Sequence, residues 1–137
     1  MCVLGRTELI SGNHREEGIL VLSGGLTAHN LRDRESFSPK TARPIHQEFD
    51  QAIHAAIQIP SVSAISDSVG NKPFNRSFQA EERKQALFNL TKHPGFRASH
   101  PREDHFVPLY VALGAGDGGA VKTLMDSYGI PTFAFGL

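Results

Sequence analysis

Apolar residues recur every four positions in the segment that follows Pro44, which is the spacing of an amphipathic helix. The stripe consists of Ile45, Phe49, Ile53 and Ile57. Proline suits the first turn of a helix, because the N–H that it lacks would have no partner there. The pattern therefore predicts a helix from about residue 44 to residue 58.

Two more helices are predicted further along the chain. Ser77 can cap a helix that carries acidic residues in its first turn and that stops at Pro94-Gly95. A third helix is indicated from Phe106, where apolar residues stand at i, i+3, i+4 and i+7, and it ends at Gly114. Pro108 lies inside this pattern, so it must either occupy the first turn or kink the helix.

Two apolar runs are typical of strands. Residues 18–23 read Gly-Ile-Leu-Val-Leu-Ser before Gly24-Gly25, which predicts a strand buried on both faces of an α/β sheet. Residues 130–135 predict a terminal strand, and Pro131 places its start at a sheet edge. The segment 33–43 is charged and contains serine and proline, which favours a loop. Together these elements predict an α/β fold in which a partial sheet is flanked by helices.

Composition narrows the classes of partner. The chain has 137 residues, with 14 Lys and Arg against 14 Asp and Glu, and is expected to form one domain over 1–137. The net charge is zero, whereas a phosphate backbone or an anionic membrane surface attracts proteins through clustered Lys and Arg. Nucleic-acid and membrane partners are therefore disfavoured. No apolar run approaches the roughly 20 residues that cross a bilayer, and the opening residues lack the order of a signal peptide, so a cytoplasmic location is expected. The single cysteine, Cys2, excludes an intrachain disulfide.

The first candidate for chemistry is His29, which follows the predicted strand within the segment Ser23–Arg32. Ligands of open α/β sheets bind at the carboxyl ends of strands, and two glycines there allow a close approach of the backbone. His29 is therefore placed to face a cleft. An equally good interpretation from position alone is a turn histidine that bonds a neighbouring carbonyl. Ser23 is not the nucleophile of a Gly-x-Ser-x-Gly elbow, because Val21 stands where glycine is needed.

The second candidate is the pair His100 and His105 at the head of the third predicted helix. Five residues correspond to a separation of about 140° around a helix, so the two side chains cannot share one face. Only one of them is expected to lie in a site. The alternative is a solvated cluster of histidines and acids, in which Glu103 and Asp104 favour the positive end of the helix dipole.

Two other features are interpreted as structural. The segment Gly114–Thr123 superficially suggests a phosphate loop, but Ala120 and Val121 stand between the glycines and Lys122. A helix stop and a turn are the better interpretation. His46 is interpreted as a residue of the surface or of a helix flank.

Taken together, the histidine motifs resemble a known family. Residues 23–32 read Ser-Gly-Gly-x-x-x-His-Asn-Leu-Arg, and residues 100–115 read His-Pro-x-x-x-His-x-x-Pro-Leu-x-x-x-x-Gly-Ala. Their order and separation resemble the class III extradiol ring-cleavage dioxygenases, most closely the 4,5-DOPA dioxygenase branch of the protocatechuate 4,5-dioxygenase superfamily. The resemblance covers nearly the whole chain but only the C-terminal half of the family.

The resemblance implies a mononuclear non-haem metal, Fe(II) or Zn(II), with a catecholic aromatic substrate and O2 in the intact parent. His105 matches the last metal ligand of the family, nine residues before Gly114-Ala115. His29 matches the acid/base histidine, and the ordinary pKa of histidine, about 6.5, suits proton transfer at neutral pH. The other two ligand histidines of the family lie in an N-terminal half that nothing in this sequence matches.

The chain is therefore expected to be the C-terminal portion of an extradiol dioxygenase, lacking its N-terminal half, inactive alone and prone to self-association. The alternative is a non-catalytic α/β interaction or regulatory domain that retains the scaffold, and metal content separates the two. If His29 and His105 belong to one site, their imidazoles should lie within about 10 Å of each other, the reach of a metal with its first and second shells.

Overall fold

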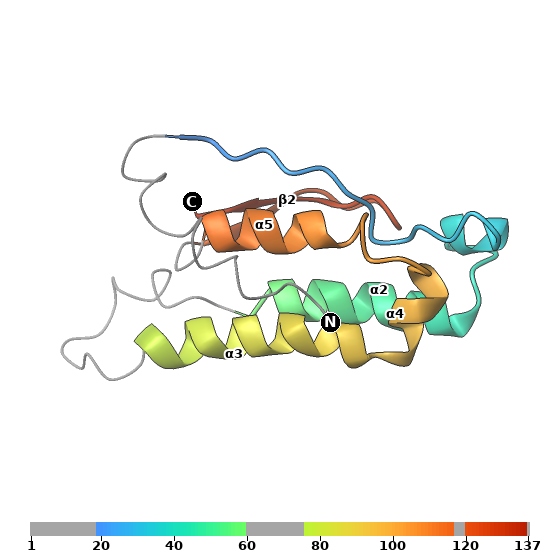
Figure 1. Cartoon of the computed structure of the whole chain (residues 1–137), viewed down its shortest axis with the longest axis horizontal. Helices are drawn as coiled ribbons and strands as arrows, with labels where there is room; N and C mark the ends of the chain where they lie inside the picture. The colour runs from blue at the N-terminus through green and yellow to red at the C-terminus, as the bar shows by residue number, and fades with distance from the viewer. Residues whose placement is uncertain (1–18, 60–75, 117–119, 137) are drawn as a thin grey trace.

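The computed structural model describes residues 19–59, 76–116 and 120–136 (Figure 1). In these ranges the longer helices are α2 (Pro44–Ile57), α3 (Arg76–Asn89), α4 (Pro94–Ser99) and α5 (Val107–Ala115). Short 3₁₀ helices lie at Arg34–Phe37 and Leu90–Lys92, and the strands are β1 (Val121–Met125) and β2 (Thr132–Phe135). The expected α/β class is confirmed.

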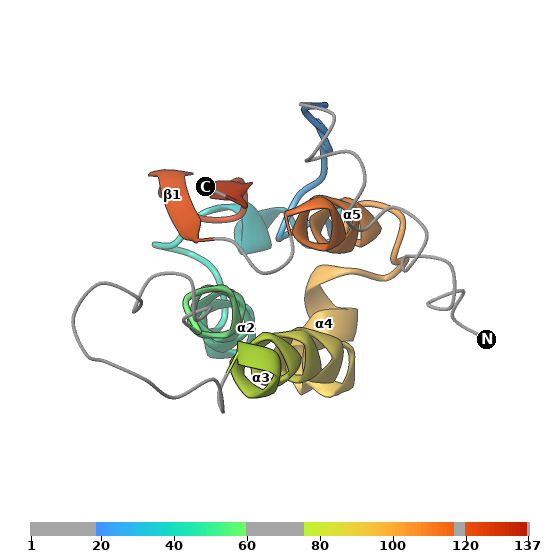
Figure 2. The ribbon, with the colours of Figure 1, turned by 90° about the vertical axis from the view of Figure 1, so that its left-hand side faces the viewer.

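The elements form two layers. Helices α2, α3 and α4 pack together in one layer, and α5 with the β1–β2 hairpin forms the other, as Figures 1 and 2 show from two directions. The strands pair antiparallel, with Val121 opposite Phe135, and the register shifts between Thr123 and Met125. No helix in the described ranges is both long enough and apolar enough to cross a membrane.

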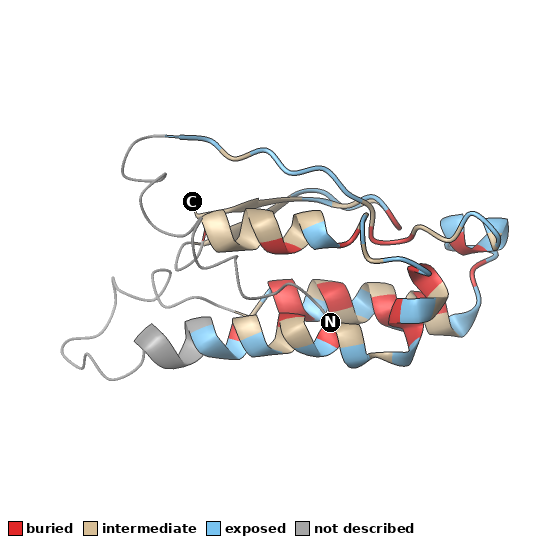
Figure 3. Ribbon diagram, viewed as in Figure 1, coloured by how far each residue is buried: buried red, intermediate tan, exposed pale blue. Residues whose placement is uncertain are grey.

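The core lies where the two layers face each other (Figure 3). Phe49 of α2 is fully buried, and its ring contacts Phe96 of α4 at a centroid distance of 5.9 Å and Phe106 at 5.8 Å. Tyr110 of α5 donates its hydroxyl to the carbonyl oxygen of Leu87 at 2.8 Å, which links α5 to α3. Burial of these aromatic groups is what holds the two layers together.

The predicted first and third helices are confirmed as α2 and α5, and Pro108 occupies the first turn of α5 rather than kinking it. The end of the second predicted helix is wrong. Helix α3 stops at Asn89, and Pro94 begins α4 instead of ending a helix. His93 caps α4, because its Nδ1 accepts a hydrogen bond from the N–H of Gly95 at 3.0 Å. Proline directly after such a cap is pre-organised for a first turn.

The strand predictions have mixed outcomes. The terminal run is confirmed as β2, with Pro131 just before it. The predicted buried strand is wrong for its described residues, 19–23, which form no strand; Leu20 is 80% exposed and Leu22 86%. An apolar run becomes a buried strand only when neighbouring strands pair with it, and among the described residues none does. Strand β1 was not predicted, and the loop 33–43 contains the 3₁₀ helix at Arg34–Phe37.

Candidate active site

The two histidines singled out by the motifs lie in direct contact. The ring centroids of His29 and His105 are 3.7 Å apart, and the planes are tilted by 37°. His29 comes from the loop after the extended segment 19–26, and His105 stands two residues before α5. The expectation that both imidazoles lie within about 10 Å is confirmed. The His105 side chain is 44% exposed, so the pair is open to an incoming ligand.

His105 is held by the segment that precedes His29. The N–H of Leu26 donates to the carbonyl oxygen of His105 at 2.9 Å, and the hydroxyl of Ser23 donates to the carbonyl oxygen of Pro108 at 2.7 Å. Gly25 lies so close that a Cβ there would run into the carbonyl oxygen of His105, whereas a Cβ on Gly24 would meet open space. Glycine at position 25 therefore serves a close approach between two backbone segments.

His29 is held from the other side by the end of α4. Its N–H donates to the carbonyl oxygen of Ser99 at 2.8 Å, and the side-chain amide of Asn30 donates to the carbonyl oxygen of Ala98 at 2.8 Å. The N–H of Thr27 bonds the carbonyl oxygen of Gly129 at 3.0 Å, in the loop between β1 and β2. These contacts join the loop that carries His29 to both layers of the fold.

His100 lies in the wall behind the pair. It is fully buried among aromatic rings, with Phe106 at a centroid distance of 5.0 Å, and its Nε2–H donates to the carbonyl oxygen of Thr27 at 2.9 Å. Burial lowers the pKa of His100 to about 4, and the charges of His29 and His105 act in the same direction, so the ring is neutral at neutral pH. Its Nδ1 has no hydrogen-bond partner among the described residues.

The solvated cluster considered for residues 100–105 is therefore only partly correct. Asp104 is exposed, and Glu103 pairs with Arg97, whose hydrogen bond holds the pKa of Glu103 below its ordinary value. His100, in contrast, belongs to the core.

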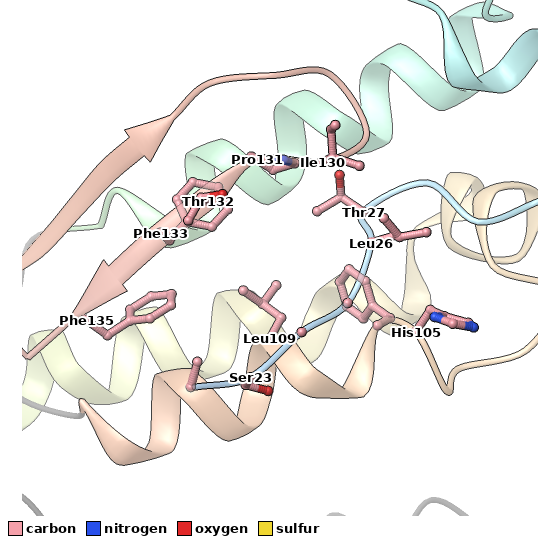
Figure 4. Close-up of a pocket in the computed structure, with 14 residues that line it drawn as sticks. Ser23, Leu26, Thr27, His105, Leu109, Ile130, Pro131, Thr132, Phe133 and Phe135 are labelled. Atoms are coloured by element: carbon pink, nitrogen blue, oxygen red, sulfur yellow. The ribbon is translucent and has the colours of Figure 1, made fainter. Parts of the chain in front are cut away.

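A pocket of about 220 Å3 begins beside His105. Figure 4 shows His105 at one end and Phe135 at the other, with Leu109 of α5 and Phe133 of β2 on the walls. The residues that line it include Leu26, Phe106, Leu109, Ala112, Ile130, Pro131, Phe133 and Phe135. No Asp, Glu, Lys or Arg lines this described pocket, but Ser23, Thr27, Thr132 and His105 do, so its interior suits an uncharged group with both apolar and polar parts.

The donor set at the pair fits part of a metal site. Imidazole is a good ligand for both iron and zinc, and the half-exposed His105 can offer a ring nitrogen, with Oδ2 of Asp104 3.9 Å from its Nε2. A catalytic zinc or iron site commonly draws three ligands from protein. The described residues bring no group of three His, Cys, Asp or Glu side chains together, and the pair supplies two imidazoles at most.

Residues 7–137 match the family model described as the catalytic LigB subunit of aromatic ring-opening dioxygenase. The chain belongs to the LigB family. This confirms the extradiol dioxygenase resemblance, and enzymes of the family depend on a metal. No solved structure matches this LigB-family chain significantly.

Two curated relatives match the LigB-family chain. It is 37% identical over 118 residues to the 4,5-DOPA dioxygenase extradiol-like protein of Schizosaccharomyces pombe, covering 86% of this chain and 34% of that protein. It is 27% identical over 104 residues to the 4,5-DOPA dioxygenase extradiol of Escherichia coli, covering 76% of this chain and 31% of that protein. The chain thus spans about a third of the length of these relatives.

One group of residues near the site escaped the sequence analysis. His46 was expected on the surface or a helix flank, but it is buried, with 2% of its surface exposed, and it contacts Asp33 and Ser99. Neither Asp33 nor Ser99 belongs to a motif that could have revealed the contact. The three positions lie far apart in sequence, so no local spacing signals it.

Proposed function

We propose that this chain supplies His105 as a metal ligand and His29 as the acid/base group of an extradiol ring-opening dioxygenase acting on catecholic compounds with O2. The observation that carries the proposal is the contact between the two imidazoles, 3.7 Å between centroids, which joins two motifs distant in sequence. Membership of the LigB family supports the reaction class.

The roles of the two histidines follow from their surroundings. His105 is anchored through its own backbone, so its exposed ring can bind a metal without moving the chain. A bound Fe(II) would supply the Lewis-acid and redox chemistry that joins a catechol to O2, and Zn(II) would supply the Lewis-acid part. The backbone of His29 is held by Ser99. A neutral imidazole at this position can take a proton from a catechol hydroxyl and return the proton later.

The pocket beside His105 supports an aromatic substrate. Its lining combines aliphatic and aromatic side chains with Ser23, Thr27 and Thr132, and its volume of about 220 Å3 is that of a small ring compound rather than of a peptide or nucleotide. His105 stands at one end of this pocket, so a substrate with its diol beside His105 can extend an apolar part toward Phe133 and Phe135. The uncharged lining favours substituents without a carboxylate, because an unpaired charge buried there would lose its hydration.

The isolated chain should bind metal weakly and should not turn over. Three protein ligands are the usual minimum for a catalytic metal, and the described residues offer one or two. We infer that the remaining ligands come from the two thirds of a LigB-family protein that this chain does not align with.

A chimera tests the proposal. This chain would replace the aligned segment of the Schizosaccharomyces pombe relative, and metal content and O2 uptake with catechols would be measured. His105→Ala should abolish stoichiometric metal binding. His29→Ala should leave the metal in place and lower turnover by about 10²- to 10⁴-fold, the usual contribution of a general acid/base.

His54→Ala is the matched control for the chimera, because His54 lies on α2 beside Asp126 and Phe133 rather than at the pair. It should retain both metal and turnover. Full metal content in the His105→Ala chimera, with O2 uptake intact, would refute the assignment of His105.

A non-catalytic interaction domain is the second candidate, favoured by one observation. Leu20 and Leu22 are 80% and 86% exposed, and Ile19 beside them is 50% exposed, which is typical of a surface that binds another chain. A chimera that folds and binds no metal, while the wild-type relative does, would favour this candidate.

A further inference from the structure

A series of hydrogen bonds runs from the surface, where Arg43 bonds Asp33, to the buried residue Ser99, which holds His29. His46 of α2 stands in its middle: its Nε2 lies 3.2 Å from Oδ2 of Asp33, and its Nδ1 lies 2.9 Å from Oγ of Ser99. His46 and Ser99 are almost completely buried, with 2% and 1% of their surfaces exposed. At the outer end, Arg43 donates to the same Oδ2 of Asp33 at 2.9 Å.

The charge on Asp33 fixes the direction of its bond to Nε2 of His46. Partial burial alone would raise the pKa of Asp33, but the hydrogen bonds from His46 and Arg43 bring that pKa below its ordinary value, so the group is a carboxylate at neutral pH. A carboxylate only accepts, so Nε2 of His46 carries the proton and donates. Nδ1 of His46 bonds Oγ of Ser99 at 2.9 Å, and a hydroxyl can either donate to or accept from that nitrogen.

The order Asp, His, Ser is that of a hydrolase triad, but the geometry excludes this role. The Ser99 side chain is buried in the body of the fold and is not among the residues that line the pocket. A nucleophilic serine must reach a substrate carbonyl, and the hydrogen-bond partner of this hydroxyl among the described residues is His46. These hydrogen bonds therefore have a structural effect within the protein rather than a role as nucleophile.

What these hydrogen bonds act on is the loop of His29. The carbonyl oxygen of Ser99 accepts the N–H of His29 at 2.8 Å, and Asn30 is fixed to Ala98 by its side-chain amide. Asp33, at the other end of the same short loop, is fixed to Ser99 through His46. Both ends of the loop 29–33 are thus attached to the last residues of α4, one directly and one through His46.

We propose that His46 is a positioning residue that keeps the imidazole of His29 against His105 by tying Asp33 to Ser99. The catalytic meaning of this position rests on the proposed function of His29, but the geometric effect does not. Within this series of hydrogen bonds, His46 is the residue that belongs to α2. It therefore couples the packing of α2 to the orientation of the two histidine rings.

Nuclear magnetic resonance on the histidine-labelled chain, without metal or substrate, tests the proposal. Cross-relaxation between the imidazole protons of His29 and His105 reports their ring contact. His46→Phe keeps a planar aromatic ring, although a larger one, but removes the hydrogen bonds to Asp33 and Ser99, and it should abolish this signal. His46→Gln keeps one donor and one acceptor on the same side chain and should restore it.

Two further variants complete the design. Ser99→Ala removes only the hydroxyl and leaves the carbonyl that holds His29, and it should also weaken the signal. This variant carries the test if His46→Phe does not fold. His54→Phe is the matched control on α2, where His54 meets Asp50 and Asp126, and it should keep the signal at full strength.

A His29–His105 signal of wild-type intensity in folded His46→Phe would overturn the proposal, because a merely structural His46 lowers stability without moving the pair. If His46→Phe is unfolded, full intensity in Ser99→Ala has the same consequence. The measurement uses neither metal nor turnover, so a failure of the dioxygenase assignment in the chimera would leave its result unchanged.

Discussion

Acidification should destabilise the protein through His100. Burial lowers the pKa of His100 in the folded state to about 4, although its bond to the carbonyl of Thr27 opposes the shift. In the unfolded chain a histidine takes up its proton near pH 6.5. Between these values the unfolded state binds a proton that the native state does not. Stability is therefore complete above about pH 6.5 and falls by about 1.4 kcal/mol per pH unit, which gives about 3 kcal/mol by pH 4.

Urea unfolding of the wild type and of His100→Gln between about pH 7 and pH 4 measures this loss. Glutamine keeps an N–H for the carbonyl of Thr27 but cannot titrate, so the variant should lose about 3 kcal/mol less than the wild type over the same range. Acid titration of Asp33, whose folded-state pKa is lowered, removes stability at the acid end in both proteins and cancels in the difference. Leu90→Ala is the control: removal of this buried side chain should cost about 2–5 kcal/mol at every pH and leave the slope unchanged. Parallel curves for wild type and His100→Gln would refute the reasoning.

Two other changes have defined outcomes. Gly25→Ala should lower the free energy of unfolding by about 1–3 kcal/mol, as overpacking does, because a Cβ at position 25 meets the carbonyl oxygen of His105. The same clash should weaken the ring contact of His29 with His105. Gly24→Ala is the control, because its Cβ meets open space, and its free energy of unfolding should stay within about 0.5 kcal/mol of wild type. Equal unfolding free energies for the two alanine variants would contradict this. The chain should self-associate through its exposed apolar segment, so replacing Leu20 and Leu22 together with serine should lower the sedimenting mass at high concentration. A wild-type chain that sediments as a single monomer at all concentrations would show that the segment is not an interface.

The helices were predictable wherever the signal was local. The stripe from Ile45 to Ile57 marks one face of α2, and that face is the one buried against α4 and α3. The predicted helix end at Pro94 was wrong because proline and glycine occur both where helices end and where they begin. The decision between the two depends on His93 as a cap and on Gly95 fitting against the backbone of Ile45, which the spacing of residues does not show.

The strands were less predictable because pairing is not local. Residues 19–23 have the composition of a buried strand, yet burial depends on partners, and in the described structure Leu22 is among the most exposed apolar side chains. Strand β1 is short and mixed in polarity, with the pattern Val-Lys-Thr-Leu-Met, and it exists because β2 lies beside it. Its sequence alone gives no period strong enough to predict it.

In the site, too, residues with a local sequence signal were predicted and residues joined only by tertiary contacts were not. His29 and His105 were found because each belongs to a motif whose residues are close in sequence, and the predicted proximity of their rings is confirmed. His46 and Ser99 were not found, because they are separated by 53 positions and neither stands in a motif. Burial of a histidine with both ring nitrogens bonded is a tertiary property, and only the packing of α2 against α4 creates it.

The loop of His29 lies away from any strand, so its backbone groups depend on irregular partners. The N–H of His29 is bonded to Ser99, and the carbonyl oxygen of Thr27 to His100. Displacing the backbone of residues 27–29 would break these bonds and leave buried groups unpaired, at a cost of about 1–3 kcal/mol for each. Two such losses make a displaced loop rarer than the observed one by roughly thirtyfold or more, since 1.4 kcal/mol corresponds to a factor of ten. The position of the backbone that carries His29 is therefore set by the fold, and the proposed role of His29 in proton transfer requires such a fixed position.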